Sequence, residues 1–561
     1  MPLETSMRTR CGMRSKCAIT MPLQAKNYLS GRHEMKYPLR PLVFWPTFLI
    51  LMAAVTASYV DLESFLRTSS QLNSLILTNF SWLFSAGSFA LVVLTFVVYF
   101  SPLGKVRIGG ENAEPLLSKW RWFMVALCTT LAVGVLFWTT AEPLYHLHSP
   151  PSSLSLEPAS AAAKSFAMAT MFLHWTITPY AIYLVPSLVF ALVFYNLRSN
   201  FSIGAMLQPL LGQARVKRYA GLIDTMAMFA LVAGMASSLG TGALTLSGGL
   251  SQYIGGETTP LRLAIIIGVI VITFVASAAS GLQRGIVMLS SFNTWIMLAL
   301  GLFMLVCGPT LYMFSLGVES LGVYLDNFFA MSLFTGAANG DTWPQSWSVF
   351  YWSVWFAWAP VSAMFLGKIG RGYTVREFVQ ITMFYPALFT GLWICIFSGS
   401  SLYFDALGDG SLNKVLTNQG VEHVLYQLFQ QLPASGLMVA FLLFVAFISF
   451  VTAADSSTDV ISNLCSKGVT ADSDLDGNPL LKVIWGVIIG IVSWVMVAFV
   501  GIDGVKMLSN LGGLPGMIIV LLASTSMLIW LRNPELLSGN VTEQAFDPEA
   551  PAGIRAGEVM Q

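Results

Sequence analysis

About twelve long apolar runs dominate this sequence, and each is long enough to cross a lipid bilayer as a helix. They cover residues 42–60, 80–100, 121–141, 166–196, 220–240, 261–280, 287–312, 346–367, 376–398, 433–460, 480–502 and 507–531. A helix rises about 1.5 Å per residue, so roughly twenty apolar residues span the hydrocarbon core. The sequence therefore predicts an all-α polytopic membrane protein with about 12 transmembrane helices.

The composition agrees with a membrane protein. Of the 561 residues, 55% are hydrophobic and 10% are charged, whereas a soluble domain carries about a quarter charged residues. The formal net charge of +1 gives no sign of a nucleic-acid partner. The six cysteines show no paired metal-binding spacing, and most of them lie in or beside apolar runs. We therefore expect no disulfide framework and no metal site.

The basic residues indicate which side of the membrane each loop faces. If the N-terminus is cytoplasmic, all but five of the 29 Lys and Arg residues fall on the cytoplasmic side. The five exceptions are Arg67, Lys164, Arg262, Lys414 and Lys506. Cytoplasmic loops are enriched in Lys and Arg, so both termini are expected to be cytoplasmic. Residues 1–40 then form a basic tail without a signal peptide, 41–532 the membrane domain and 533–561 the C-terminal tail.

The densest aromatic stretch of the chain lies within residues 346–378. On a helix, residues three, four, seven and eight apart share a face. One face therefore carries Trp347, Tyr351, Val354, Trp355 and Trp358. Taken alone, such a stripe is as consistent with lipid-facing or core packing as with a binding site.

The end of this stretch carries a more specific pattern. Pro360 interrupts the apolar run, and the chain leaves it as R-G-x-T-x-R-E, with Arg371 and Arg376 as its two arginines. A Trp-rich helix, an aromatic–Pro break and this exit resemble the signature of the betaine–carnitine–choline transporter family. Residues 101–122 also resemble the loop before the third helix of that family. The resemblance extends over roughly residues 40–530.

The resemblance implies a fold, a location and an assembly. The fold is a leucine-transporter-like inverted repeat of five plus five helices behind two extra leading helices. The repeats are helices 3–7, about 121–312, and helices 8–12, about 346–531, with broken helices 3 and 8 as symmetry mates. Family members are often trimers, so a homo-oligomer in the cell inner membrane is expected.

The resemblance also implies a function. The chain is expected to import a quaternary ammonium or related onium compound, such as betaine, choline or carnitine, by alternating access with cation coupling. Its partners would be that small molecule and membrane lipid. One alternative is an ion-independent exchanger of substrate and product. A remote alternative is a membrane-embedded enzyme, which needs a nucleophile–base pair or metal cluster that the sequence does not offer.

Aromatic residues suit an onium ligand because a quaternary ammonium has no N–H to donate. Trp and Tyr faces attract it through the ring quadrupole, by about 0.5–2 kcal/mol per ring. The resemblance adds Trp175, Tyr180 and Tyr183 of the fourth helix as further walls of this box. At Val354 the family usually has another wall, so the box is predicted to be more open on that side.

The helix over residues 131–146 is predicted to bend or unwind. Gly134 and Pro143 weaken its hydrogen-bond ladder, and broken helices expose carbonyls that bind ions. The backbone of Leu131 is therefore a candidate cation ligand, although a purely structural kink explains the pattern as well. The adjacent Glu142 is expected at the outer membrane edge with a structural role.

Two histidine patterns are expected to be structural. His174 is expected to form an interhelical hydrogen bond. His146 and His148 have the spacing of a metal pair, but the sequence offers them no third ligand.

Two further polar patterns point to a coupling ion. Thr452 and Asp455 lie in an apolar helix, where a carboxylate is costly and usually functional. Ser237 and Ser238 lie in a run of small residues that is equally consistent with close helix packing. The resemblance makes Thr452 and Ser238 candidate side-chain ligands of Na⁺, the possible coupling ion in a chain expected to need no other cofactor. Ala453, Leu231 and Met235 replace hydroxyls of sodium-coupled members, so weak Na⁺ dependence is predicted.

Overall fold

The computed structural model describes residues 38–131, 134–279, 283–471 and 478–537. The predicted N-terminal tail up to residue 37, the C-terminal tail from residue 538, and residues 132–133 lie outside the described residues.

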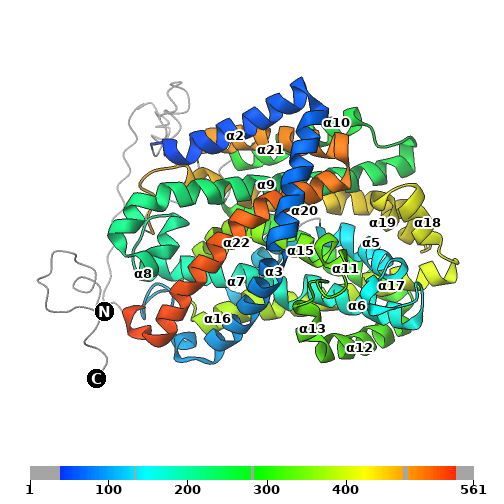
Figure 1. Ribbon diagram of the computed structural model, residues 1–561, viewed down its shortest axis with the longest axis horizontal. Helices are drawn as coiled ribbons and strands as arrows, with labels where there is room; N and C mark the ends of the chain where they lie inside the picture. The colour runs from blue at the N-terminus through cyan, green and yellow to red at the C-terminus, as the bar shows by residue number, and fades with distance from the viewer. Residues whose placement is uncertain (1–37, 132–133, 280–282, 472–477, 538–561) are drawn as a thin grey trace, which may run out of the picture.

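The described residues are almost entirely helical, and their extended pairings are two isolated bridges. They contain eleven helices long and apolar enough to cross a membrane, or twelve when the bent pair α4–α5 counts as one. Two leading spans precede two groups of five (Figure 1). The all-α, twelve-span fold predicted from the sequence is confirmed.

The spans follow the chain in this order. The leading pair is α2 (Pro41–Val60) and α3 (Leu62–Phe100). The first group is α4 (Lys119–Leu131) with α5 (Gly134–His148), α6 (Ala161–Trp175) with α7 (Ile177–Ala191), α9 (Gln213–Ile254), α10 (Pro260–Ala279) and α11 (Gln283–Cys307). The second group is α15 (Ser348–Ile369), α16 (Val375–Val379) with α17 (Tyr385–Leu407), α20 (Ser435–Leu464), α21 (Pro479–Val500) and α22 (Ile502–Arg532).

Shorter helices connect these spans. Between α11 and α15 they are α12 (Thr310–Asp326), α13 (Phe328–Ser332) and α14 (Trp343–Ser346). Between α17 and α20 they are α18 (Ser411–Asn418) and α19 (Val424–Gln430). The four-residue α8 (Gln208–Leu211) precedes α9.

Two spans of the first group are broken, and both breaks lie beside the cavity described below. The axes of Lys119–Thr130 and Gly134–His148 differ by 57°, as the predicted bend in this segment requires. The second break falls at Thr176, between α6 and α7. Pro179 explains its position, because a proline ring clashes with the carbonyl four residues earlier in a continuous helix.

The predicted break of the eighth span at Pro360 is wrong. Helix α15 runs without interruption from Ser348 to Ile369 and contains Pro360. A helix tolerates one missing N–H when its neighbours supply the packing, and α15 is buried along almost its whole length.

Helix α15 lies deep in the molecule because its neighbours present glycines to it. A Cβ on Gly516 of α22 would lie 2.1 Å from the Phe356 carbonyl oxygen, and one on Gly513 would lie 2.7 Å from Ser353. On α9, Gly234 leaves similar room for Trp358. Backbones can approach this closely only where side chains are absent.

The predicted exit motif forms a short structural joint. Thr374 and Glu377 form a capping box that starts α16. Backbone hydrogen bonds join residues 106–108 to residues 372–375. Arg376 donates to the Tyr99 carbonyl, and the Arg371 guanidinium lies over the Tyr195 ring. Arg376 therefore links α16 to the end of α3, and Arg371 contacts the helical segment that follows α7.

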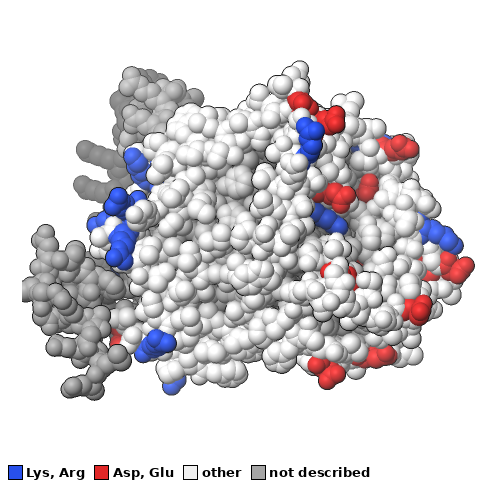
Figure 2. Space-filling model, in the orientation of Figure 1, with Lys and Arg blue, Asp and Glu red and all other residues white. Residues whose placement is uncertain are grey.

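Charged residues separate along the long axis of the molecule. Figure 2 shows Lys and Arg gathered at the end that carries α8 and α16, and Asp and Glu mainly at the opposite end. The broad middle is nearly free of charge on this face. This is the distribution expected of a protein whose middle lies in lipid.

The close α15–α22 contact yields a stability prediction. Gly516→Ala should lower the apparent unfolding temperature of the purified protein, because its Cβ would overlap the Phe356 carbonyl; overpacking of this kind costs about 1–3 kcal/mol. Thermal unfolding in detergent measures the effect. Gly301→Ala in α11 is the matched control, since a Cβ there has nothing within 4 Å. Equal unfolding temperatures for the two variants would contradict the packing described here.

Candidate functional site

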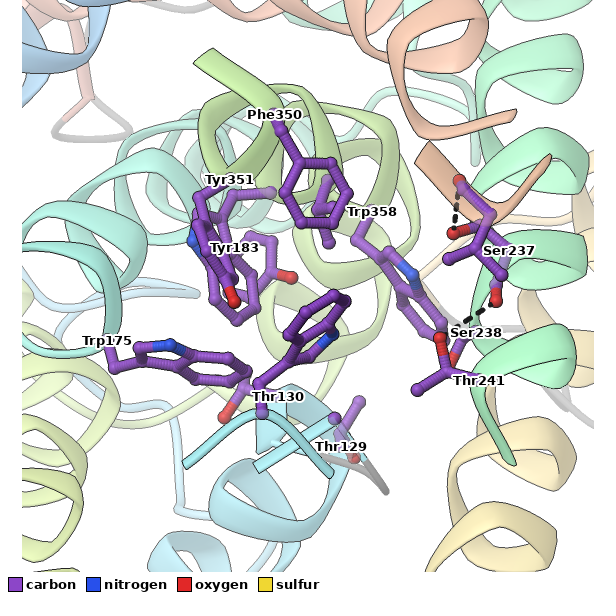
Figure 3. Close-up of a pocket in the computed structure, with 15 residues that line it drawn as sticks. Thr129, Thr130, Trp175, Tyr183, Ser237, Ser238, Thr241, Phe350, Tyr351 and Trp358 are labelled. Atoms are coloured by element: carbon purple, nitrogen blue, oxygen red, sulfur yellow. Dashed lines mark hydrogen bonds between the residues drawn. The ribbon is translucent and has the colours of Figure 1, made fainter. Parts of the chain in front are cut away.

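A cavity lies beside the middle of α15, between both broken spans, α9 and the start of α22 (Figure 3). Its lining residues are Thr129, Thr130, Gly134, Trp138, Trp175, Tyr183, Ser237, Ser238, Thr241, Phe350, Tyr351, Val354, Trp355, Trp358 and Val505. None of these side chains is charged.

Six of the seven residues predicted to contact a substrate line this cavity. They are Trp175, Tyr183, Tyr351, Val354, Trp355 and Trp358. Tyr180 is not in the lining, and its hydroxyl is hydrogen-bonded to Thr390 at 2.8 Å. Trp347 precedes α15 and packs against Tyr145 and His146 instead. Direct contact of any of these residues with a substrate stays a prediction.

The sequence reasoning missed several lining residues. Phe350 lies one turn before Val354 on the same face, so the helical spacing alone could have predicted it. Thr129 and Thr130 directly precede the predicted unwound segment. Trp138 lies one turn beyond Gly134. Their contribution depends on the bend between α4 and α5, which the sequence predicts without giving its direction.

Three indole N–H groups fix the aromatic walls. Trp355 donates to the carbonyl of His174 at 3.1 Å, and Trp358 donates to that of Gly234 at 3.1 Å. Trp175 donates to a carboxylate oxygen of Glu142 at 2.7 Å. These donors are engaged by the protein, so the three N–H groups are not available to a molecule in the cavity.

The break at Thr176 explains one of these anchors. The last carbonyls of a helix have no intrahelical partner, and His174 lies in the last turn of α6. Its carbonyl is therefore available to Trp355. The ring of Trp355 also contacts the rings of Trp175 and Tyr183 edge to face, with centroids 5.2 and 5.7 Å apart.

Hydroxyl groups line the cavity between and beside the rings, with Thr130 near Trp175, and Ser238 and Thr241 near Trp358 (Figure 3). Thr129, Thr130 and Thr241 each donate to the carbonyl four residues earlier in their own helix. Their oxygen lone pairs remain free to accept a hydrogen bond or to coordinate a cation. Ser238 lines the cavity and is partly exposed.

The cavity lining includes one of the two side chains predicted to bind a cation. Ser238 lines the cavity, whereas Thr452 is absent from the described lining. The Thr452 hydroxyl donates to the Ile448 carbonyl of its own helix at 2.7 Å. Leu131 is the last residue of α4, and its side chain lies outside the described residues. A role of these residues in cation binding stays a prediction.

Asp455 belongs to a polar network in the second group of spans. It accepts a hydrogen bond from Ser277 of α10 at 3.0 Å. One turn further on, Asp459 binds Lys368 of α15 at 3.1 Å and Lys482 of α21 at 3.0 Å. The sequence reasoning singled out Asp455, but Asp459 is the carboxylate that links three helices.

Glu142 is the most strongly bound carboxylate near the cavity. It is fully buried inside the protein, and its expected place at the outer membrane edge stays a prediction. Besides Trp175, it contacts His174 Nδ1 at 2.7 Å and His146 Nε2 at 3.1 Å. His174 also bonds Ser348 at 2.9 Å, so its predicted role as an interhelical hydrogen bonder is confirmed.

His146 and His148 have the sequence spacing of a metal pair, but their side chains have different partners. His146 faces Glu142, whereas His148 Nε2 bonds Asp405 of α17 at 2.7 Å. Residues two apart on a helix point in different directions, which explains the separation.

The remaining predicted hinge residues lie in α5: Gly134 lines the cavity and faces the Trp175 ring, and Pro143 is inside the helix.

The fold and cavity together define a multi-pass membrane protein with a small-molecule site between broken helices. The family model for betaine/carnitine/choline family transporters matches residues 42–536. This chain therefore belongs to the betaine/carnitine/choline transporter family, whose members are transporters and not enzymes.

Individual relatives support the assignment. The chain is 30% identical over 487 residues to a glycine betaine transporter of Bacillus subtilis, covering 86% of this chain and 93% of that protein. It is 29% identical over 476 residues to a probable glycine betaine transporter of Desulfitobacterium hafniense, covering 84% and 93%. It is 28% identical over 495 residues to an ectoine/hydroxyectoine transporter of Virgibacillus pantothenticus, covering 88% and 97%.

A solved structure of a Na⁺-coupled sialic acid symporter is also similar. It has a TM-score of 0.42 and 14% identity, and the match covers 81% of this chain and 96% of that one.

The cavity wall yields an accessibility prediction. In a background with the native cysteines replaced, Ser238→Cys should react with a small thiol reagent much faster than Ser237→Cys. The Ser237 hydroxyl is buried against Ser509 and the Val505 carbonyl, whereas Ser238 is partly exposed beside the cavity. Mass spectrometry after timed labelling measures both rates. Slow labelling at both positions would show that Ser238 does not face an accessible cavity.

Proposed function

We propose that this chain imports a quaternary ammonium or related onium compound, such as betaine, choline, carnitine or a similar solute, by alternating access. The aromatic walls of the cavity carry this proposal. The N–H groups of Trp175, Trp355 and Trp358 donate to protein acceptors, and their side chains line a cavity without charged residues. Such a space favours a cation without N–H donors.

The energetics fit a reversible transport site. Each ring face contributes about 0.5–2 kcal/mol to binding of a desolvated cation. Three or four rings then contribute several kcal/mol, which is partly offset by the lost freedom of the bound molecule. Affinities in the micromolar to millimolar range follow, and a transporter needs a site that also releases its ligand.

The shape of the site bears on the substrate class. Two relatives are named for glycine betaine and one for ectoine and hydroxyectoine. Val354 leaves one side of the aromatic cage without a ring, which favours solutes bulkier than a trimethylammonium group. The hydroxyls of Thr129, Thr130 and Thr241 offer polar contacts in the cavity.

Coupling to a cation is part of the proposal. One Na⁺ moving with a zwitterion gains about 2.3 kcal/mol per 100 mV of membrane potential. Thr452 has lone pairs available because its hydrogen is directed into its own helix. Ala453, Leu231 and Met235 supply no hydroxyl, so the proposed Na⁺ dependence is weak. The alternative is ion-independent exchange of substrate and product.

Location and assembly complete the proposal. The basic end of the molecule is proposed to face the cytoplasm, with both termini on that side of a cell inner membrane. The homo-oligomer implied by the resemblance stays a prediction.

The aromatic cage is tested by substitution. Trp355→Leu and Trp358→Leu should each weaken binding of glycine betaine, or of whichever onium compound binds, by about tenfold or more. Leucine keeps much of the bulk but removes the ring quadrupole. Calorimetry on folded protein measures the affinity. Trp295→Leu is the control, since its ring is 59% exposed on α11. Unchanged affinity in both cage variants would rule out this site.

Weak sodium dependence is tested by uptake into proteoliposomes. Uptake should rise with Na⁺ without saturating at low millimolar concentration, because a site lacking hydroxyl ligands loses about 1–3 kcal/mol. Thr452→Ala should remove the dependence. Thr458→Ala is the matched control, because its hydroxyl is likewise buried and bonded within α20. Identical uptake in Na⁺ and K⁺ buffers would favour exchange over sodium coupling.

A further inference from the structure

A buried cluster of three titratable side chains lies directly behind the aromatic wall. Glu142 and His146 come from α5, and His174 comes from the last turn of α6. All three have no exposed surface. The two imidazoles meet the same carboxylate oxygen, at 2.7 Å for His174 and 3.1 Å for His146. The uptake mechanism proposed above does not use this cluster.

The hydrogen bonds indicate where a proton can be added. If both histidines are neutral, each donates one N–H to Glu142, and the cluster carries one negative charge. His174 Nε2 then accepts from the Ser348 hydroxyl at 2.9 Å. His146 Nδ1 is buried without a hydrogen-bond partner in the described part of the chain. This nitrogen has a free lone pair for a proton.

The short contacts favour protons over a metal ion as the third component. Ligand atoms around one tetrahedral ion at about 2.0–2.1 Å lie roughly 3.3 Å from one another. The contacts from Glu142 to the imidazoles are those of N–H···O hydrogen bonds, and that from His174 is clearly shorter.

One side chain belongs to both the cluster and the cavity. Trp175 donates its N–H to Glu142 at 2.7 Å, and its ring lines the cavity. The same ring contacts Tyr351 and Trp355, with centroids 5.4 and 5.2 Å apart. A change of charge at Glu142 is therefore separated from the aromatic cage by a single indole.

We propose that the Glu142–His146–His174 cluster binds a proton, and that this proton opposes binding of the onium compound in the cavity. The inference rests on the proposed function, because it needs a cationic head group beside Trp175. An unprotonated cluster places one negative charge behind that ring and favours the cation. A proton on His146 cancels this charge. By linkage, binding of the onium compound then releases protons to the same degree.

Other ionisable groups face this region and define the controls. On neighbouring elements they are Lys506 and Asp503 of α22, Tyr351 of α15, Tyr145 of α5, Glu422 before α19, and the His148–Asp405 pair. The Lys506 ammonium lies over the rings of Trp347 and Phe350, at 4.6 and 5.5 Å. Lys506 is therefore the main rival as the origin of a pH effect.

Calorimetry on the purified full chain tests the proposal, with glycine betaine as the probe. Its carboxyl group stays ionised in the range where histidine titrates, about pH 5 to 8. The affinity should fall by about fivefold or more from the upper to the lower part of this range. Titrations in two buffers of different ionisation enthalpy should show net proton release on binding in the acidic part.

Variants assign the effect to the cluster. His146→Gln keeps a donor for Glu142 but cannot be protonated, so its affinity should become independent of pH and its linked proton release should vanish. His148→Gln is the matched control, two residues further along α5 and bonded to Asp405, and it should behave as the unaltered protein does. Lys506→Gln should retain the pH dependence.

Several outcomes would overturn the proposal. Binding of glycine betaine to the unaltered protein without linked proton release would overturn it, even if a variant fails to fold. A pH dependence of the affinity that persists in His146→Gln or disappears in Lys506→Gln would also overturn it. Zn²⁺ binding that depends on Glu142 and His146, and that accounts for the released protons, would replace the proton site with a metal site. Absence of binding for every onium compound tested would instead refute the proposed function.

Discussion

The structure depends on one constraint: polar groups exposed by a break in a membrane helix need partners inside the protein. Two breaks lie beside the cavity, and an aromatic N–H group meets this need at the second. Trp355 donates to the carbonyl of His174 at the end of α6. Trp175 donates to the buried carboxylate of Glu142 on the half-helix that follows the first break, which also needs partners inside the protein. These bonds also orient two rings of the cage.

This solution leaves the cavity without charge. Its lining offers aromatic rings and hydroxyl oxygens, while the nearby carboxylates are bound elsewhere. Glu142 lies behind Trp175, and Asp459 is held between Lys368 and Lys482. A binding site of this kind selects by shape and by attraction to aromatic faces. It does not hold its ligand through an ion pair that would resist release.

The sequence was most informative where one regular helix determines the geometry. Helix α15 keeps its period across Pro360, so the face carrying Tyr351, Val354, Trp355 and Trp358 follows from spacing alone. Spacing could not place Tyr180, because its direction depends on the break three residues before Pro179. Contacts between distant segments were equally inaccessible. The partners of Glu142 come from its own helix and from α6, and no spacing in the sequence shows that these side chains meet.

The anchoring of the cage constrains how the proposed alternating access can operate. Trp355 is bonded to α6 and Trp358 to α9, while glycines of α22 hold α15 at close range. A rotation of α15 alone would break both indole bonds and leave buried donors and acceptors unpaired, at about 1–3 kcal/mol each. Motion that keeps α15, the end of α6 and the middle of α9 together avoids this cost. The cage then stays preorganised while the surrounding helices open one side or the other, so ligand affinity need not be rebuilt in each cycle.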